Sequence, residues 1–203
     1  MPLALFALTI SAFAIGTTEF VIVGLVPTIA EQLTISLPSA GMLVSIYALG
    51  VAIGAPVLTA LTGRLPRKQL LIALMVLFTA GNLLAWQAPG YMTLIAARLL
   101  TGLAHGVFFS IGSTIATSLV AKEKAASAIA IMFGGLTVAL VTGVPLGTFI
   151  GQHFGWRETF LAVSGLGVIA LIGSQWLIPA NIPGRAAATL RDQVSVLTHR
   201  SEE

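Results

Sequence analysis

The stretch GGLTVALVTGVPLGTFIG, residues 134–151, gives the clearest indication of the fold of this chain. Small residues recur in it at every fourth position: Gly135, Ala139, Gly143, Gly147 and Gly151. Residues four apart share one helix face, and a stripe of small side chains lets two helices approach closely in lipid. Pro145 lies inside the stretch, and its missing N–H predicts a kink. We therefore expect a membrane-spanning helix; the plainer alternative is a packing seam with no function of its own.

The composition places the chain in a membrane. Of its 203 residues, 57% are hydrophobic and 8% are charged, whereas soluble domains carry about 25% charged residues. The chain has no cysteine, which excludes disulfides and thiolate metal sites. The net charge of +3 predicts no nucleic-acid partner, because the basic residues lie in short connections between apolar runs. We expect no metal site, no cofactor and no enzymatic activity, since no nucleophile–base set or phosphate loop is present.

Six apolar stretches are long enough to cross about 30 Å of hydrocarbon. They lie near residues 3–27, 39–62, 69–88, 92–119, 127–151 and 158–178. The first stretch has no basic residues before it and runs beyond any cleavage site, so it predicts a spanning helix rather than a signal peptide. We expect an all-α membrane protein in which residues 1–183 form a six-helix bundle. Residues 184–203 are expected to start a cytoplasmic central loop or tail.

The basic residues predict the orientation, because cytoplasmic loops are enriched in Lys and Arg. Eight of the ten fall in the second connection, the fourth connection and the tail: Arg64, Arg67, Lys68, Lys122, Lys124, Arg185, Arg191 and Arg200. Both termini are therefore expected on the cytoplasmic side of the membrane, with the lipid bilayer as a partner.

A weak internal repeat relates the two halves of the chain. Gly54-Ala-Pro56 in the second stretch matches Gly143-Val-Pro145 in the fifth, 89 positions later. Each copy would hold three helices, so the second copy would be inverted in the membrane. The pattern predicts the inverted repeats that are typical of secondary transporters.

Two charged residues lie inside predicted spans. An ionisable group at the bilayer centre costs at least ~2.5–3.5 kcal/mol on insertion scales, so such a group predicts a function. Glu19 lies eight residues before Pro27, and Arg98 lies seven residues after Tyr91. These similar depths predict that both side chains face one central cavity and pair directly or through water. A purely structural ion pair is the alternative.

His105 follows Arg98 by two helical turns and extends the same face. Gly102 and Gly106 are expected to keep that face open, which makes His105 and these glycines candidates for the cavity lining. A satisfied polar histidine without function is the alternative. Thr17 and Thr18, beside Glu19, are further cavity candidates, although their hydroxyls are expected to bond to backbone carbonyls one turn back.

These residues resemble the major facilitator superfamily over essentially the whole chain, as the N-terminal half of a twelve-helix transporter. Arg98-x3-Gly102-x3-Gly106 is similar to a fourth-helix motif whose Arg is implicated in proton coupling. A second run is similar to the fifth-helix antiporter motif of exporters, and it comprises Gly134, Gly143, Pro145, Gly147 and Gly151. GTTEFVIVGLVPTIA, residues 16–30, resembles the first helix of arabinose, sugar and purine efflux permeases in the drug:proton antiporter group.

The connection between the second and third stretches departs from the family pattern. The basic residues Arg64, Arg67 and Lys68 remain, but Gly63 and Pro66 stand where the family has an Asp and a Gly. The resemblance implies a proton-coupled antiporter that exports a small solute such as a sugar, nucleoside or drug, with Glu19 and Arg98 coupling protons. It also implies a location in a bacterial inner membrane and a C-terminal half as partner. The alternatives are a complete six-helix transporter or channel acting as a homodimer, and a non-transporting membrane fragment.

Overall fold

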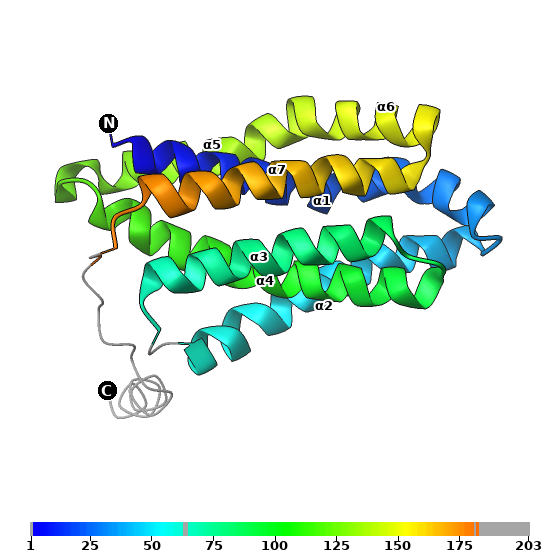
Figure 1. Cartoon of the computed structure of the whole chain (residues 1–203), viewed down its shortest axis with the longest axis horizontal. Coiled ribbons are helices and arrows are strands. Elements are labelled where there is room, and N and C mark those ends of the chain that lie inside the picture. The colour runs from blue at the N-terminus through cyan, green and yellow to red at the C-terminus, as the bar shows by residue number, and fades with distance from the viewer. Residues whose placement is uncertain (1, 63–64, 181, 183–203) are drawn as a thin grey trace, which may run out of the picture.

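The computed structural model describes residues 2–62, 65–180 and 182. Every regular element in these residues is helical, and six segments are long and apolar enough to cross a membrane. Helices are the expected form because backbone in hydrocarbon must satisfy its N–H and C=O groups internally. The helices run along the long axis of one bundle (Figure 1). The prediction of an all-α bundle with six spanning segments is confirmed.

The spans are connected by short segments. The first four are α1 (Leu3–Gln32), α2 (Leu37–Thr62), α3 (Arg67–Trp86) and α4 (Tyr91–Ser118). A 3-10 turn, η1 (Lys122–Lys124), leads to a fifth span made of α5 (Ala125–Val138), the π turn η2 (Ala139–Gly143) and α6 (Val144–Phe154). The sixth span is α7 (Trp156–Leu177). Gly155 joins α6 to α7 in one residue because it adopts φ 104°, which side chains disfavour.

The first helix continues five residues beyond Pro27, the predicted end of the first span. Pro27 is exposed, and inside a helix its missing N–H removes the bond to the carbonyl four residues earlier. Helix α1 ends where Thr34 adopts a left-handed φ of 50° and the Ile35 N–H donates to the Ala30 carbonyl at 3.0 Å. The number of residues between Glu19 and Pro27 therefore does not give the depth of Glu19 in the membrane. Its depth has to be inferred from the residues that its side chain contacts.

The predicted irregularity at Pro145 takes the form of the wide turn η2. Helix α6 begins directly after this π turn, and Pro145 is its second residue. Such turns and prolines are the usual causes of irregularity in long helices. The fifth span consequently consists of two helical pieces that follow one another along the upper side of the bundle (Figure 1).

The stripe of small residues packs on α1. All five stripe residues are buried. A Cβ added at Gly135 would collide with the Thr9 carbonyl, and one added at Gly143 would collide with the Thr17 hydroxyl. A Cβ added at Gly147 or Gly151 would also crowd side chains of α1, and to a lesser degree Thr159 of α7, whereas a Cβ at Gly134 would meet open space. The stripe is therefore a tight interhelical seam, and Gly134 is not part of it.

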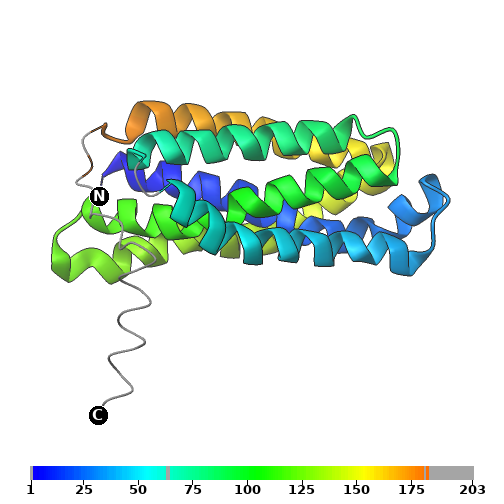
Figure 2. The ribbon, with the colours of Figure 1, turned by 90° about the horizontal axis from the view of Figure 1, so that it is seen from below.

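The helix pairs follow the internal repeat. Helix α2 packs along α4, and α5 packs along α1, so the second helix of each repeat contacts the first helix of the other. The third helices, α3 and α7, pack on one another. Figure 2 shows α2 and α4 side by side. This exchange of partners is the arrangement expected of two related three-helix units.

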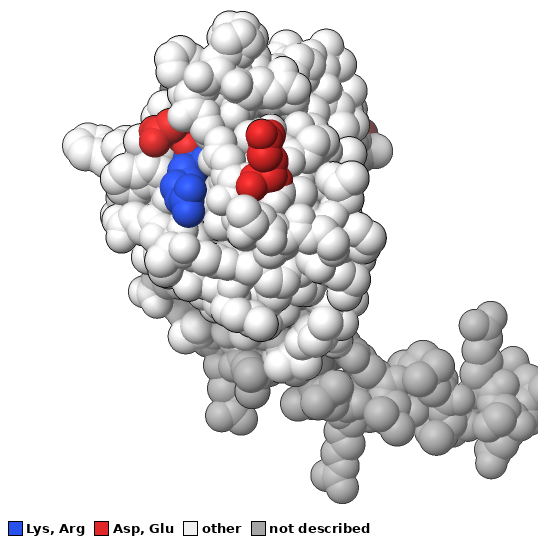
Figure 3. All heavy atoms as spheres, turned by 90° about the vertical axis from the view of Figure 1, so that its right-hand side faces the viewer, with Lys and Arg blue, Asp and Glu red and all other residues white. Residues whose placement is uncertain are grey.

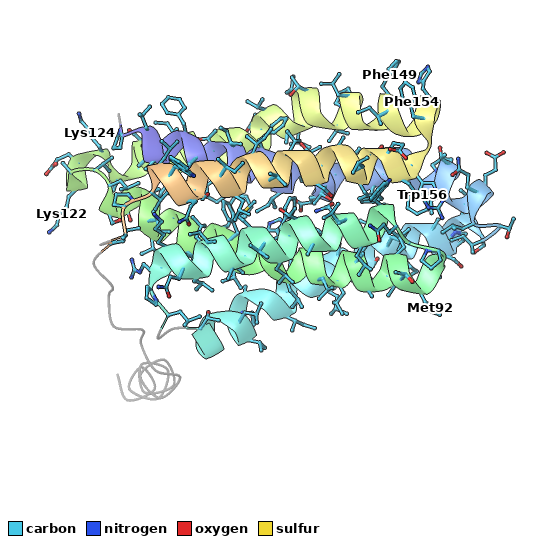
Figure 4. The ribbon with its side chains drawn as sticks, in the orientation of Figure 1. Met92, Lys122, Lys124, Phe149, Phe154 and Trp156 are labelled. Atoms are coloured by element: carbon cyan, nitrogen blue, oxygen red, sulfur yellow. The ribbon has the colours of Figure 1, made fainter. Side chains whose placement is uncertain are left out.

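Apart from Arg98, most of the described basic residues lie near one end of the bundle. Lys122 and Lys124 stand at the end opposite to Met92 and Trp156 (Figure 4). The face at the opposite end shows one small basic patch beside acidic residues on an otherwise uncharged surface (Figure 3). Arg157 is a partly buried residue near that end, and its guanidinium donates to the Ala88 carbonyl at 2.8 Å. Arg64 and the tail at 184–203 lie outside the described residues.

Candidate functional site

A buried polar layer divides the apolar core at mid-depth. One apolar cluster uses α1 up to Ile15, and a second cluster uses α1 from Val21 onward. The residues between them are polar and buried: Thr17 and Thr18 on α1, Thr79 and Asn82 on α3, and Arg98 and Thr101 on α4. Polar groups so far from the ends of a spanning bundle are costly unless they bond to one another or serve a function.

Arg98 is the centre of this layer and is only 1% exposed. Its Nη1 donates to the Thr18 carbonyl at 2.8 Å, and its Nε donates to the Leu43 carbonyl at 3.4 Å. Its guanidinium carbon lies 4.1 Å from the ring centroid of Tyr47, which is a cation–π arrangement. Nη2 has no hydrogen-bond partner among the described residues. The charge is therefore stabilised by two carbonyl dipoles and an aromatic face, while the Nη2 amino group is left without a partner among the described residues.

Glu19 lies beside the layer and is partly exposed. Its Oε2 is 3.7 Å from Nδ1 of His105, and 26% of its side chain is accessible. Within the described part of the chain there is no direct salt bridge between Glu19 and Arg98. Glu19 follows Thr18 by one residue, and residues one apart point in different directions around a helix. Arg98 thus meets the backbone of α1 at the level of Glu19, while the carboxylate turns to His105.

His105 connects the carboxylate to Tyr47 and to an aromatic row. The Tyr47 hydroxyl and Nδ1 of His105 are 2.9 Å apart, with the donor decided by the histidine tautomer. The centroids of His105 and Phe109 are 4.9 Å apart, and those of Phe109 and Phe133 are 4.8 Å apart. Four helices therefore contribute to one cluster: α1, α2, α4 and α5.

Four predicted cavity residues lie elsewhere than expected. Gly102 and Gly106 do not keep a face open, because the backbone of α2 at Tyr47 and Val51 covers them. Thr17 and Thr18 are buried inside the bundle rather than lining an open face. The Thr17 hydroxyl does donate to the Phe13 carbonyl one turn back.

The Thr18 hydroxyl corrects a further expectation. It donates to Oδ1 of Asn82 at 2.7 Å on α3, not to a carbonyl of its own helix. Nδ2 of Asn82 donates to the Phe78 carbonyl at 2.9 Å, which fixes the orientation of the amide. The chain of contacts from Asn82 through Thr18 to Arg98 therefore ties three helices together.

Tyr47 and Asn82 are the residues that sequence reasoning missed. Both are polar side chains within apolar spans, and such groups tend to bond across helices. That signal would have marked both residues, although not their partners.

Lys68, predicted only as part of a loop motif, donates to the Gln175 carbonyl at 2.8 Å near the end of α7. In the described residues, no three His, Cys, Asp or Glu side chains gather as metal ligands would.

Comparisons with known proteins agree with this architecture. A model described as Major Facilitator Superfamily matches residues 8–200. The uncharacterized MFS-type transporter YtbD of Bacillus subtilis is 54% identical over 196 residues, which are 97% of this chain and 50% of that protein. The inner membrane transport protein YdhP of Escherichia coli is 49% identical over 193 residues, 95% of this chain and 49% of its own length.

A solved structure gives the same fold. The crystal structure of the peptide transporter POT in complex with sulfate aligns with a TM-score of 0.79 at 15% identity. The alignment covers 99% of this chain and 44% of that one. The chain therefore spans about half the length of the relatives that it matches, and its six spanning segments align with slightly less than half of that solved transporter. It belongs to the major facilitator superfamily.

Proposed function

We propose that this chain is half of a proton-coupled antiporter that exports a small solute, such as a sugar, nucleoside or drug, across a bacterial inner membrane. The observation that carries the proposal is the half-buried Glu19 carboxylate, 3.7 Å from His105 and on the same level as buried Arg98. An ionisable group at this depth is costly and marks an ion or substrate path in membrane proteins. The names of YtbD and YdhP, both transporters, support the same class.

Coupling requires that one proton change the preference between two states. With Glu19 ionised, its charge lies beside His105, and the Arg98 guanidinium lies behind it in the core. Protonation removes the negative charge and weakens its attraction to both groups. A bundle that rocks between inward-open and outward-open states would then favour one of them, and the solute would favour the other. The second six-helix half would close the site from the side of Glu19.

The test is solute exchange in proteoliposomes under an imposed pH gradient. It uses this chain alone and, in parallel, the full product of its reading frame, across sugars, nucleosides and drugs. Glu19→Gln mimics the protonated carboxyl, so uptake driven by the gradient should fail while solute binding or exchange without a gradient survives. Glu123→Gln removes the same charge from the exposed turn η1 and should leave transport unchanged.

The outcomes separate the alternatives. Activity only in the longer product supports a two-half transporter. Activity of this chain alone would favour the six-helix homodimer. If neither this chain nor the longer product exchanged any solute, the chain would be a non-transporting fragment. Transport that ignores the pH gradient in the wild type would exclude proton coupling.

A further inference from the structure

We propose that the face around Glu19 selects organic cations that carry an aromatic or apolar body. This face is defined here as Glu19, His105, Phe109, Phe133 and Thr137. The proposal rests on the proposed function in that it names the class of solute. It concerns the chemistry that the residues present, so it can be tested without any measurement of transport.

The first support is the position of the carboxylate. The Glu19 side chain is 26% exposed, whereas the other polar side chains of the mid-depth layer are buried. A carboxylate turned toward lipid at this depth would be strongly disfavoured. The face must therefore border water, protein or a bound solute. A cation would be attracted to Glu19 more strongly here than in bulk water, because the effective dielectric constant is lower.

The second support is that Arg98 cannot receive an anion on this face. The guanidinium is 1% exposed, lies against the Tyr47 ring and is directed at carbonyls of Thr18 and Leu43. An anion that approached the face would be repelled by the Glu19 carboxylate. It would also find no accessible guanidinium N–H from which to accept a hydrogen bond. The other described Lys and Arg residues lie at or beyond the helix ends, in or beside the connections: Arg67, Lys68, Lys122, Lys124 and Arg157.

The third support is the aromatic row that leads away from the carboxylate. His105, Phe109 and Phe133 follow one another with centroids 4.9 and 4.8 Å apart, and Phe133 is 38% exposed. Aromatic faces attract cations and bury apolar groups. A carboxylate at the head of such a row offers a charge contact and a flat apolar surface to the same molecule. A sugar can stack on aromatic rings and donate hydroxyl hydrogen bonds, but it carries no positive charge, so it gains less from the carboxylate than an organic cation does.

The test measures the electrostatic preference of the face directly with charged thiol reagents. The chain contains no cysteine, so Thr137→Cys introduces one reporter of similar size. Thr137 is exposed and lies one helical turn after Phe133. Its reaction rates with a cationic and an anionic methanethiosulfonate of matched size are compared in nanodiscs and normalised to a free thiol. We expect the cation to be favoured on the order of tenfold, and Glu19→Gln to remove most of that preference.

A matched reporter and a direct probe complete the experiment. Ser127→Cys is an exposed position on the same helix, ten residues earlier, and its rate ratio should not respond to Glu19→Gln. Benzyltrimethylammonium should slow the labelling of Thr137→Cys, whereas benzenesulfonate should not. Equal rates, an anion preference, a preference that survives Glu19→Gln, or no reaction with either reagent would each overturn the proposal. Loss of proton coupling in liposomes would contradict the proposed function and leave these ratios as they are.

Discussion

The backbone carbonyl of Thr18 accepts a hydrogen bond from Nη1 of Arg98 at 2.8 Å, and this contact holds the buried guanidinium on α1. The neighbouring carboxylate of Glu19 turns away to His105. Hydrogen bonds from a charged donor are stronger than neutral ones. The charge in the core is therefore stabilised by the helix backbone, and the carboxylate of Glu19 remains partly exposed.

Arg98→Lys should destabilise the protein by about 1.5–3 kcal/mol, because an ammonium cannot reach both the Thr18 and the Leu43 carbonyls or cover the Tyr47 ring. Arg98→Gln should be at least as damaging. Thermal unfolding in detergent measures the effect. Adding Glu19→Gln to Arg98→Gln should not restore stability, since the two side chains form no direct pair here. Full recovery in the double variant would show that they act as an ion pair.

Thr18→Val and Asn82→Leu should differ in effect although they remove the same hydrogen bond. Thr18→Val leaves the buried Oδ1 of Asn82 without its donor, which costs about 1–3 kcal/mol. Asn82→Leu frees the Thr18 hydroxyl to bond one turn back in its own helix, so its cost should be smaller. The double variant should be more stable than Thr18→Val alone.

The control for this pair is Thr79→Val, on α3. Its buried hydroxyl donates only to the Met75 carbonyl of its own helix, so no partner side chain loses a bond. Thermal unfolding of the four variants provides the measurement. Equal losses for Thr18→Val and Asn82→Leu, with no recovery in the double variant, would contradict the contact seen here.

Gly135→Ala and Gly134→Ala place the same methyl group on adjacent residues with opposite expected results. At Gly135 the methyl would collide with the Thr9 carbonyl on α1, so folded protein should be lost. At Gly134 it meets open space, and the gain in helix propensity is up to about 1 kcal/mol. The yield of monodisperse protein after extraction reports both. Similar yields would mean that the stripe does not pack on α1.

The orientation of the chain can be tested with two cysteines in a chain that has none. Gln87 follows α3, and Ser118 is the last residue of α4, so they lie at opposite ends of the bundle. If the basic end is cytoplasmic, an impermeant thiol reagent added to intact cells should label Gln87→Cys only. Permeabilised cells should show labelling at both positions. Labelling of Ser118→Cys alone in intact cells would reverse the topology.

The sequence by itself determined the class of the protein. Its low charge, its six apolar stretches and the stripe around Gly143 required a membrane bundle of helices, because hydrocarbon leaves the backbone few other choices. The depth argument also brought Glu19, Arg98 and His105 to one region. Periodicity and length carry these facts, since both depend on neighbouring residues along one helix.

Only the tertiary structure decided which groups meet. The main partner of Arg98 is a backbone carbonyl, and every residue carries one, so no side-chain pattern marks Thr18 as the acceptor. The spacing of Gly102 and Gly106 predicts an open face, but the backbone of α2 covers both residues. The face of α1 that meets Asn82 depends on how three helices rotate against one another. That rotation is set by packing between helices, which the spacing of residues along any one of them does not determine.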